Sequence, residues 1–199
     1  MAKLHFKYAT MNSGKSLDLM RTVYNYEELG FKVFVIKPLV DTKGKDAIES
    51  RVGLRRVVDL LLDYNDDVTK VLKGKLENVK VIFVDEAQFL NPKQVDDLFV
   101  LSKALDIPVI CYGLRTDFQM KSFNGSNRLL EIADVLEEIQ TLCHCGNIAR
   151  FVGRKKNGKY GLDGPTIVID GTSDYEYIPL CGKCYLEEVR KIDLDKYKK

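Results

Sequence analysis

One segment near the N-terminus limits the possible folds most strongly. The residues Ala9-Thr10-Met11-Asn12-Ser13-Gly14-Lys15-Ser16 follow a short apolar run, Leu4 to Tyr8, and precede an amphipathic stretch from Leu17 to Leu29. A strand, such a loop and a helix in this order are the context of a phosphate-binding loop, in which backbone N–H groups and the helix N-terminus hold the phosphates. The usual pattern has Gly where this chain has Ala9. The segment predicts an α/β protein that binds a phosphate group at its first strand-to-helix turn.

A second polar segment follows a buried strand. Residues 79–84 are almost continuously apolar, which is typical of a parallel strand covered on both faces, and Asp85 and Glu86 come directly after them. Lys15 would neutralise the β and γ oxygens of a nucleotide, and Ser16 and Asp85 would hold Mg²⁺. Glu86 is the candidate general base, because a carboxylate beside the metal can take a proton from an attacking hydroxyl. When such an acidic pair stands alone, a helix cap or a solvated turn is the alternative.

Strands and helices alternate along the first two-thirds of the chain. We expect strands at 4–8, 33–36, 79–84 and 109–112, and a helix over 17–29 that ends at Gly30. We also expect one or two amphipathic helices over 57–72, and a further helix capped by Asn91 with Pro92 as its first residue. The predicted buried faces are Leu17, Met20, Val23 and Tyr24 on the first helix and Val95, Leu98, Phe99 and Leu101 on the last. This pattern predicts a mostly parallel sheet with ligands at the carboxyl ends of its strands.

The cysteines indicate a metal site late in the chain. Cys143-His144-Cys145 and Cys181-Gly182-Lys183-Cys184 form two short chelating pairs, and the fifth cysteine, Cys111, lies in a predicted buried strand as a small core side chain. Four thiolates suit structural Zn²⁺, and in a reducing compartment this spacing favours metal over disulfides. His144 could replace a neighbouring Cys as a ligand, although a solvated or supporting His fits better. We therefore expect a nucleotide-binding domain over 1–139, a small zinc-binding module over 140–190 and a flexible tail over 191–199.

Composition excludes several classes of protein. Of the 199 residues, 45% are hydrophobic and 30% charged, as in an ordinary globular protein. The net charge of +2 gives no whole-molecule field that could hold a nucleic acid, and we interpret the basic run Arg154–Lys159 as a solvated loop. The N-terminus carries no signal-peptide pattern and no apolar run is long enough to span a membrane. We expect a cytoplasmic protein with neither a membrane nor a nucleic-acid partner.

The motifs together resemble one family. From about Leu4 to Tyr185 the chain is similar to the type II thymidine kinases of bacteria and the vertebrate cytosol. The resemblance rests on Tyr8–Ser16, on Val84-Asp85-Glu86-Ala87-Gln88-Phe89-Leu90, on Cys111–Phe118 and on the four paired cysteines. It implies a nucleotide-binding core with a zinc ribbon and a lasso-like loop that closes over the nucleoside. It also implies that ATP and thymidine are the substrates and that the protein is a homotetramer.

The resemblance assigns roles to individual residues. It implies transfer of the ATP γ-phosphate to the 5′-hydroxyl of thymidine, and of deoxyuridine, with Glu86 as the catalytic base. The expected ATP site comprises Ala9, Thr10, Met11, Asn12, Ser13, Gly14, Lys15 and Ser16 with Asp85, Glu86, Ala87 and Gln88. The expected nucleoside pocket comprises Met11, Phe89, Phe118, Phe123 and Tyr177, and main-chain groups around Thr166 to Tyr177 would read the base. The chain has Lys43 where many members have Arg, and Arg51 is another basic candidate near the phosphates or a solvated loop residue.

Two other functions fit parts of the sequence. Asp85-Glu86-Ala87-Gln88 also resembles a helicase motif, which would suit a nucleic-acid-dependent ATPase, but the chain has no room for a second motor domain. A zinc-ribbon interaction module switched by a nucleotide is the non-enzymatic alternative. Phosphorylation of free nucleosides distinguishes the kinase from both.

Overall fold

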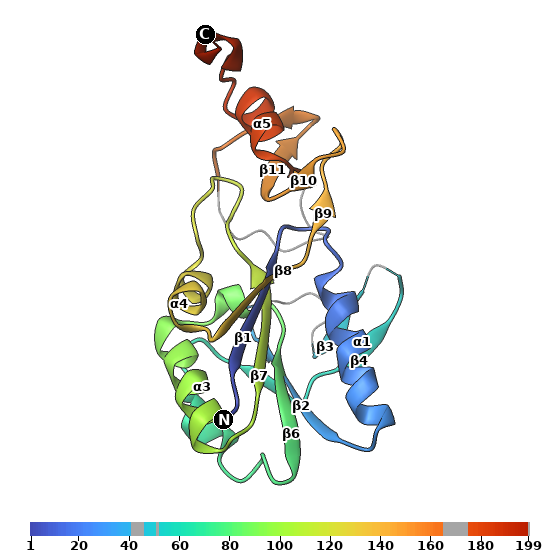
Figure 1. Cartoon of the computed structure of the whole chain (residues 1–199), viewed down its shortest axis with the longest axis vertical. Coiled ribbons are helices and arrows are strands. Elements are labelled where there is room, and N and C mark those ends of the chain that lie inside the picture. Colours follow the sequence, from blue (N-terminus) through green and yellow to red (C-terminus); the bar gives the residue numbers. More distant parts are fainter. Residues whose placement is uncertain (41–45, 51, 165–174, 199) are drawn as a thin grey trace.

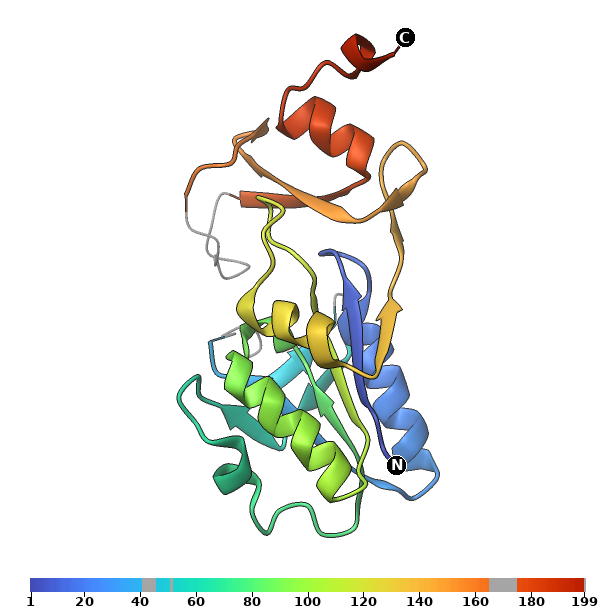
Figure 2. The same cartoon turned by 60° about the vertical axis from the view of Figure 1, so that its left-hand side comes forward.

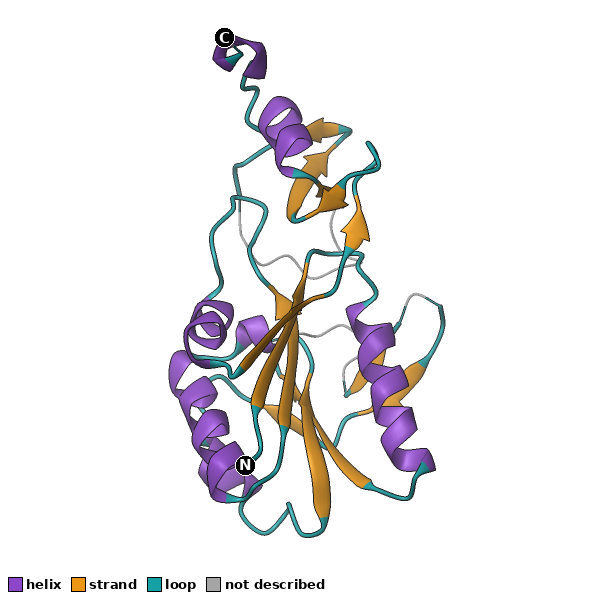
Figure 3. Ribbon diagram, viewed as in Figure 1, coloured by secondary structure: helices purple, strands orange, loops and turns teal. Residues whose placement is uncertain are grey.

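A six-stranded parallel sheet forms the centre of the protein (Figures 1 and 3). We describe a computed structural model over residues 1–40, 46–50, 52–164 and 175–198. The strand order is β5-β2-β6-β7-β1-β8, so that β7 separates β1 from β6. The strands are β1 (Leu4–Ala9), β2 (Lys32–Pro38), β5 (Leu60–Leu62), β6 (Val79–Val84), β7 (Val109–Leu114) and β8 (Val135–Glu138). Because all six are parallel, their carboxyl ends lie along one edge of the sheet.

Helices cover both faces of this sheet (Figure 2). Helix α1 (Lys15–Glu28) lies on one face, and α2 (Val68–Leu72), α3 (Pro92–Ala104) and α4 (Asn124–Ile132) lie on the other. Alternate residues of β6 enter the two cores: Val81 and Phe83 pack on the side of α1, and Ile82 and Val84 on the side of α3. This two-sided burial explains why the strand is apolar at nearly every position.

The four strands and two flanking helices predicted for the nucleotide-binding part are confirmed, but one helix face is partly wrong. Met20 and Val23 of α1 are buried, whereas Leu17 and Tyr24 are 40% and 57% exposed. Leu19 occupies the buried face instead, because the helix is turned about its own axis so that Leu19, Met20 and Val23 face the sheet. Helix α3 begins as expected at Asn91, whose side chain accepts a hydrogen bond from the backbone N–H of Gln94 at 2.8 Å.

The prediction of one or two helices over 57–72 is largely wrong. Val57 ends strand β4 (Arg55–Val57), which pairs with β3 (Ala47–Glu49), and Leu60–Leu62 forms β5 at the edge of the large sheet. Only Val68–Leu72 is helical. Pairing with β2 gives this apolar run a partner that its local periodicity could not reveal.

After β8 the chain leaves the large sheet and forms a smaller module (Figure 1). It contains β9 (Thr141–Leu142), β10 (Ile148–Ala149), β11 (Phe151–Lys156), β12 (Lys159–Tyr160), β13 (Tyr175–Leu180), α5 (Gly182–Cys184) and a π-helical turn (Tyr185–Val189). Its core is built from Leu180, Tyr185 and three of the paired cysteines. The Tyr185 hydroxyl donates to the backbone O of Phe118 at 2.5 Å, which ties the module to the loop that follows β7.

The last residues carry a short 3-10 turn (Leu194–Tyr197), and the flexibility expected of this tail stays a prediction. Across the described ranges, no helix is both long enough and apolar enough to cross a bilayer.

Candidate functional site

The phosphate loop joins β1 to α1 at the carboxyl edge of the sheet. Gly14 has φ +83° and is the N-cap of α1, and its backbone O accepts the first helical hydrogen bond, from Asp18 N, at 2.9 Å. Glycine reaches this left-handed conformation without steric cost. The Ser13 hydroxyl is buried and makes no hydrogen bond with the described residues. A loop with a buried hydroxyl and the N–H groups of a new helix fits a phosphate ligand.

Asp18 anchors the first turn of α1 to the sheet. Its carboxylate accepts hydrogen bonds from Arg21 at 2.6 Å, from Tyr112 at 3.0 Å and from Lys7 at 3.2 Å. Burial alone would raise the pKa of Asp18, but the bonds from Arg21, Lys7 and Tyr112 outweigh it and lower that pKa. The ionised carboxylate therefore holds the helix that carries the phosphate loop against β1 and β7.

Lys15 brings the phosphate loop and the acidic turn together. Its Nζ lies 2.8 Å from Glu86 Oε1, and the Lys15 side chain is only 8% exposed. The lysine is the first residue of α1, and Glu86 follows β6 by two residues. A cation that can bind phosphate oxygens and a carboxylate that can accept a proton thus occupy one location, as the sequence predicted for a nucleotide site.

The turn after β6 is tightly held. Asp85 is 3% exposed, and its N–H donates to Ile36 O of β2 at 2.9 Å. Glu86 adopts φ +48°, a left-handed conformation that non-glycine residues rarely adopt. Ala87–Phe89 then form a 3-10 turn, in which Gln88 donates from Nε2 to Glu86 Oε2. Mg²⁺ prefers oxygen ligands. The buried Asp85 carboxylate and the hydroxyl of Ser16, at the start of α1, are ligands of this type.

The residues predicted to line the nucleoside pocket make contacts in different places. The rings of Phe89 and Phe123 meet edge to face, with centroids 5.9 Å apart. Asn12 Nδ2 donates to Tyr177 O at 3.0 Å, which joins the phosphate loop to β13 next to the half-buried Met11. Two elements far apart in the sequence therefore meet beside the phosphate loop.

Phe118 is covered by a residue that the sequence interpretation misplaced. Arg154 was expected in a solvated loop with its basic neighbours, but it is only 2% exposed and its guanidinium lies 3.5 Å from the centroid of the Phe118 ring. It also lies 4.5 Å from the centroid of Tyr175 and donates to Asp163 O. The planar guanidinium can lie flat on an aromatic ring, whereas the amines of Lys155 and Lys156 approach the rings of Tyr160 and Tyr175 only as point charges, at 4.6 and 5.4 Å from the centroids. The remaining residues, Lys155 to Lys159, belong to the hairpin of β11 and β12.

The four paired cysteines converge, as expected. The sulfurs of Cys143, Cys145, Cys181 and Cys184 all lie within 4.8 Å of one another, and the distance between Cys145 and Cys181 Sγ is 3.6 Å. A backbone hydrogen bond from Asn147 is the main cause that lowers the pKa of Cys145 to about 6, whereas burial raises the pKa of Cys184. Four cysteine sulfurs this close together can bind one metal ion as thiolates, so the cluster can hold a metal ion.

His144 and Cys111 lie where the residue patterns suggested. The His144 side chain is 53% exposed, and its Nε2 lies 3.0 Å from Glu188 Oε1. His144, Glu188 and Cys184 also lie within 4.8 Å of one another, so the histidine stands beside the cysteine cluster. Cys111 is fully buried in β7, and burial raises the pKa of its thiol well above the usual range.

Comparison with known proteins places these features in one family. The family described as thymidine kinase matches residues 2–185. The chain belongs to the thymidine kinase family. The thymidine kinase of Shewanella oneidensis is 39% identical over 190 residues, covering 94% of this chain and 98% of that protein. The thymidine kinases of Streptococcus gordonii and Ruegeria pomeroyi are each 40% identical, covering 94% of this chain and 97% and 95% of those proteins.

Membership of the thymidine kinase family does not favour the helicase-like ATPase or the non-enzymatic switch. Lys43, Arg51 and the run from Thr166 to Ile169 lie outside the described residues, as does most of the segment expected to read the base. Tyr175 and Tyr177 mark where the described chain resumes after it.

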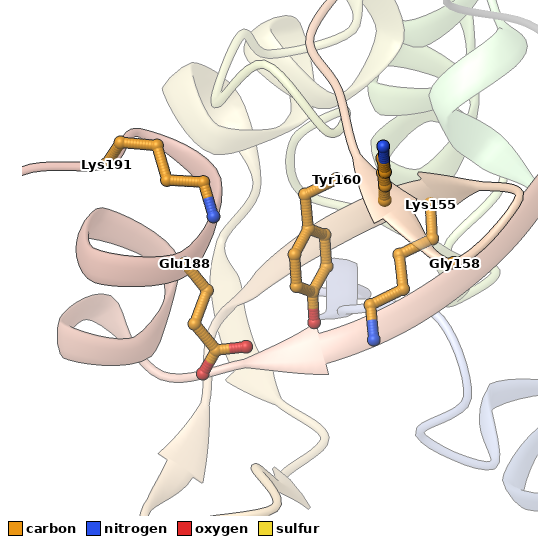
Figure 4. A pocket seen from close by; sticks show the side chains of 6 residues that line it. Lys155, Gly158, Tyr160, Glu188 and Lys191 are labelled. Atoms are coloured by element: carbon orange, nitrogen blue, oxygen red, sulfur yellow. The ribbon is translucent and has the colours of Figure 1, made fainter.

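A hollow of about 400 Å³ lies on the smaller module, away from the phosphate loop (Figure 4). It is lined by Lys155, Gly158, Lys159, Tyr160, Glu188 and Lys191. Burial, together with the nearby Glu188 carboxylate, raises the pKa of Tyr160 to about 12, so its hydroxyl stays protonated. In Figure 4, the Tyr160 ring lies between Lys191 and Lys155.

Proposed function

We propose that the protein transfers the γ-phosphate of ATP to the 5′-hydroxyl of thymidine, and of deoxyuridine, in nucleotide salvage. The observation that carries the proposal is the 2.8 Å contact between Lys15 of the phosphate loop and Glu86. It puts a proton acceptor beside the group that would bind the transferred phosphate. Phosphoryl transfer depends mainly on such positioning and on neutralisation of charge.

The chain's own residues divide this work. The amides of Ala9 to Ser16 and the Lys15 amine would bind the phosphates, and Ser16 and Asp85 would hold Mg²⁺. Bound there with ATP, the metal would neutralise phosphate charge. As the triphosphate engages Lys15, Oε1 of Glu86 becomes available to accept the proton of the 5′-hydroxyl. Met11, Phe89, Phe118, Phe123 and Tyr177 line the nucleoside site.

The cysteine cluster has a structural role in this proposal. It would hold zinc and join α5 to the five strands of the smaller module, β9 through β13. Tyr185 connects this module to the loop that contains Phe118. We further propose that the protein is cytoplasmic, forms a homotetramer, and needs no nucleic-acid partner.

The test is substitution of the proposed base. Glu86→Gln keeps the size of the side chain but removes the proton acceptor, so turnover of thymidine should fall by about 100-fold or more while ATP binding survives. Glu77→Gln, an exposed site in the loop before β6, is the matched control and should behave like the wild type. Near-normal turnover by Glu86→Gln would remove Glu86 from this role.

A further inference from the structure

The side chain of Gln88 links the Glu86 carboxylate to the end of β7. Its Nε2 donates to Glu86 Oε2, and its Oε1 accepts a hydrogen bond from the backbone N–H of Leu114 at 3.0 Å. A backbone N–H can only donate, so the amide oxygen must face Leu114 and the amide NH₂ must face Glu86. Gln88 is 2% exposed, and water does not compete for either bond.

The surroundings fix this amide in place. A Cβ on Gly113 would lie 3.0 Å from Gln88 Oε1 and 3.1 Å from Gln88 N, so the absence of a side chain at Gly113 makes room for the glutamine. The carbonyl oxygen of the same residue, Leu114, accepts a hydrogen bond from the buried Ser126 hydroxyl of α4 at 2.5 Å. Strand β7 and helix α4 therefore jointly position the group that contacts Glu86.

We propose that Gln88 is a positioning residue for phosphoryl transfer, which holds the orientation of the Glu86 carboxylate. The inference rests on the proposed function for the role of Glu86. Lys15 of α1 faces Oε1 of this carboxylate, and Asp85 precedes it in the same turn. A triphosphate would draw Lys15 away, whereas Gln88 lies outside the phosphate loop and keeps its bond to Oε2. In the working enzyme Gln88 thus still contacts the base after Lys15 has moved.

Two substitutions separate this role from simple packing. Gln88→Met removes the donor. Gln88→Glu keeps the shape and the acceptor for Leu114 but places a second carboxylate against Glu86. Loss of a hydrogen bond to a charged group should lower kcat at pH 7 by about 10- to 100-fold in both variants, with the KM for ATP changed by less than about threefold. The KM for thymidine should also change by less than about threefold, because the substitutions misdirect the base and leave the groups that bind the substrates in place.

Gln94→Met is the matched control. Gln94 is also 2% exposed, but its Nε2 donates to Asp63 O at 2.8 Å and it has no contact with the turn of Glu86. This variant should lose thermal stability and keep the kcat and both KM values of the wild type. If the Gln88 variants lose stability but keep the kcat of the wild type, Gln88 is a packing residue and the inference is overturned.

A second readout keeps the inference separate from the proposed function. The Glu86 carboxyl can be followed by carbon-13 NMR in glutamate-labelled protein, with its resonance assigned by Glu86→Gln. At one fixed pH, a carboxyl resonance that is displaced or broadened in Gln88→Met but not in Gln94→Met supports the positioning role, and a resonance that is unchanged in Gln88→Met overturns it. This result does not require turnover, whereas a wild-type protein that phosphorylates no nucleoside would refute the proposed function alone.

Discussion

Gly125 tests how closely α4 packs against the turn that carries Glu86. Gly125 is the second residue of α4, and its backbone lies outside the left-handed region, so alanine is compatible with its conformation. Helix propensity alone predicts that Gly125→Ala stabilises the protein by up to about 1 kcal/mol. The added Cβ, however, would lie 2.5 Å from Ala87 O, 2.8 Å from Leu90 O and 3.0 Å from Gln88 O.

The steric effect is the larger of the two. Carbon–oxygen contacts are comfortable near 3.3 Å, so α4 and the turn must separate by roughly 0.8 Å. Overpacking costs about 1–3 kcal/mol, and a Cβ only 2.5 Å from Ala87 O puts this site in the upper part of that range, at about 2–3 kcal/mol. A gain in propensity of about 1 kcal/mol then leaves a net loss of about 1–2 kcal/mol. In a chain of this size, that loss corresponds to a fall in Tm of about 2–8 °C.

The assay is thermal unfolding followed by circular dichroism at one fixed protein concentration, together with kcat for thymidine. Gly182→Ala is the control, because Gly182 begins α5 and its added Cβ would lie at an ordinary 3.5 Å from Phe151. Its Tm should stay within about 2 °C of the wild type. A Gly125→Ala variant as stable as the wild type, with unchanged kcat, would refute the close packing of α4 on this turn.

Three further predictions concern the metal site, pH and the contact between modules. Cys184→Ser should lose stoichiometric zinc and lower Tm together; one zinc per chain in the variant, measured by elemental analysis, contradicts the ligand assignment. The lowered pKa of Asp18 contributes stability that is present above about pH 4 and is lost as the pH falls through the pKa of the folded state. Asp18→Asn should therefore show a smaller fall of Tm between about pH 4 and 2.5 than the wild type. An equal fall in both proteins would contradict this role of Asp18. Tyr185→Phe leaves Phe118 O without its donor, so the KM for thymidine should rise severalfold while that for ATP stays constant; equal changes in both would indicate general damage.

The elements with strong local patterns were predictable from sequence. The continuous apolar run of β6 indicated a strand buried on both faces, and Asn91 with Pro92 indicated the start of α3. Residues 57–72 were not predictable, because Leu60–Leu62 owes its strand conformation to pairing with β2 at the sheet edge. Tyr24 was expected inside because helical periodicity gives the spacing of a buried face but not its rotation toward the sheet.

The candidate site, like the fold, was predictable from the sequence only in part. Lys15, Glu86 and the paired cysteines belong to motifs whose chemistry depends on residue type and spacing, and the structure brings Lys15 and Glu86 into contact. Arg154 was misread because its burial depends on Phe118 and on Tyr175, far away in the sequence. The only available signal was its residue type: arginine, unlike the lysines beside it, readily stacks on aromatic rings.

The most direct test of the central claim is phosphate transfer from ATP and Mg²⁺ to the four natural deoxynucleosides and deoxyuridine by the purified, zinc-loaded protein. We predict that thymidine and deoxyuridine form monophosphates, that purine nucleosides do not, and that added DNA or RNA leaves ATP consumption unchanged. An intact protein that binds ATP but transfers phosphate to none of these nucleosides would contradict the account.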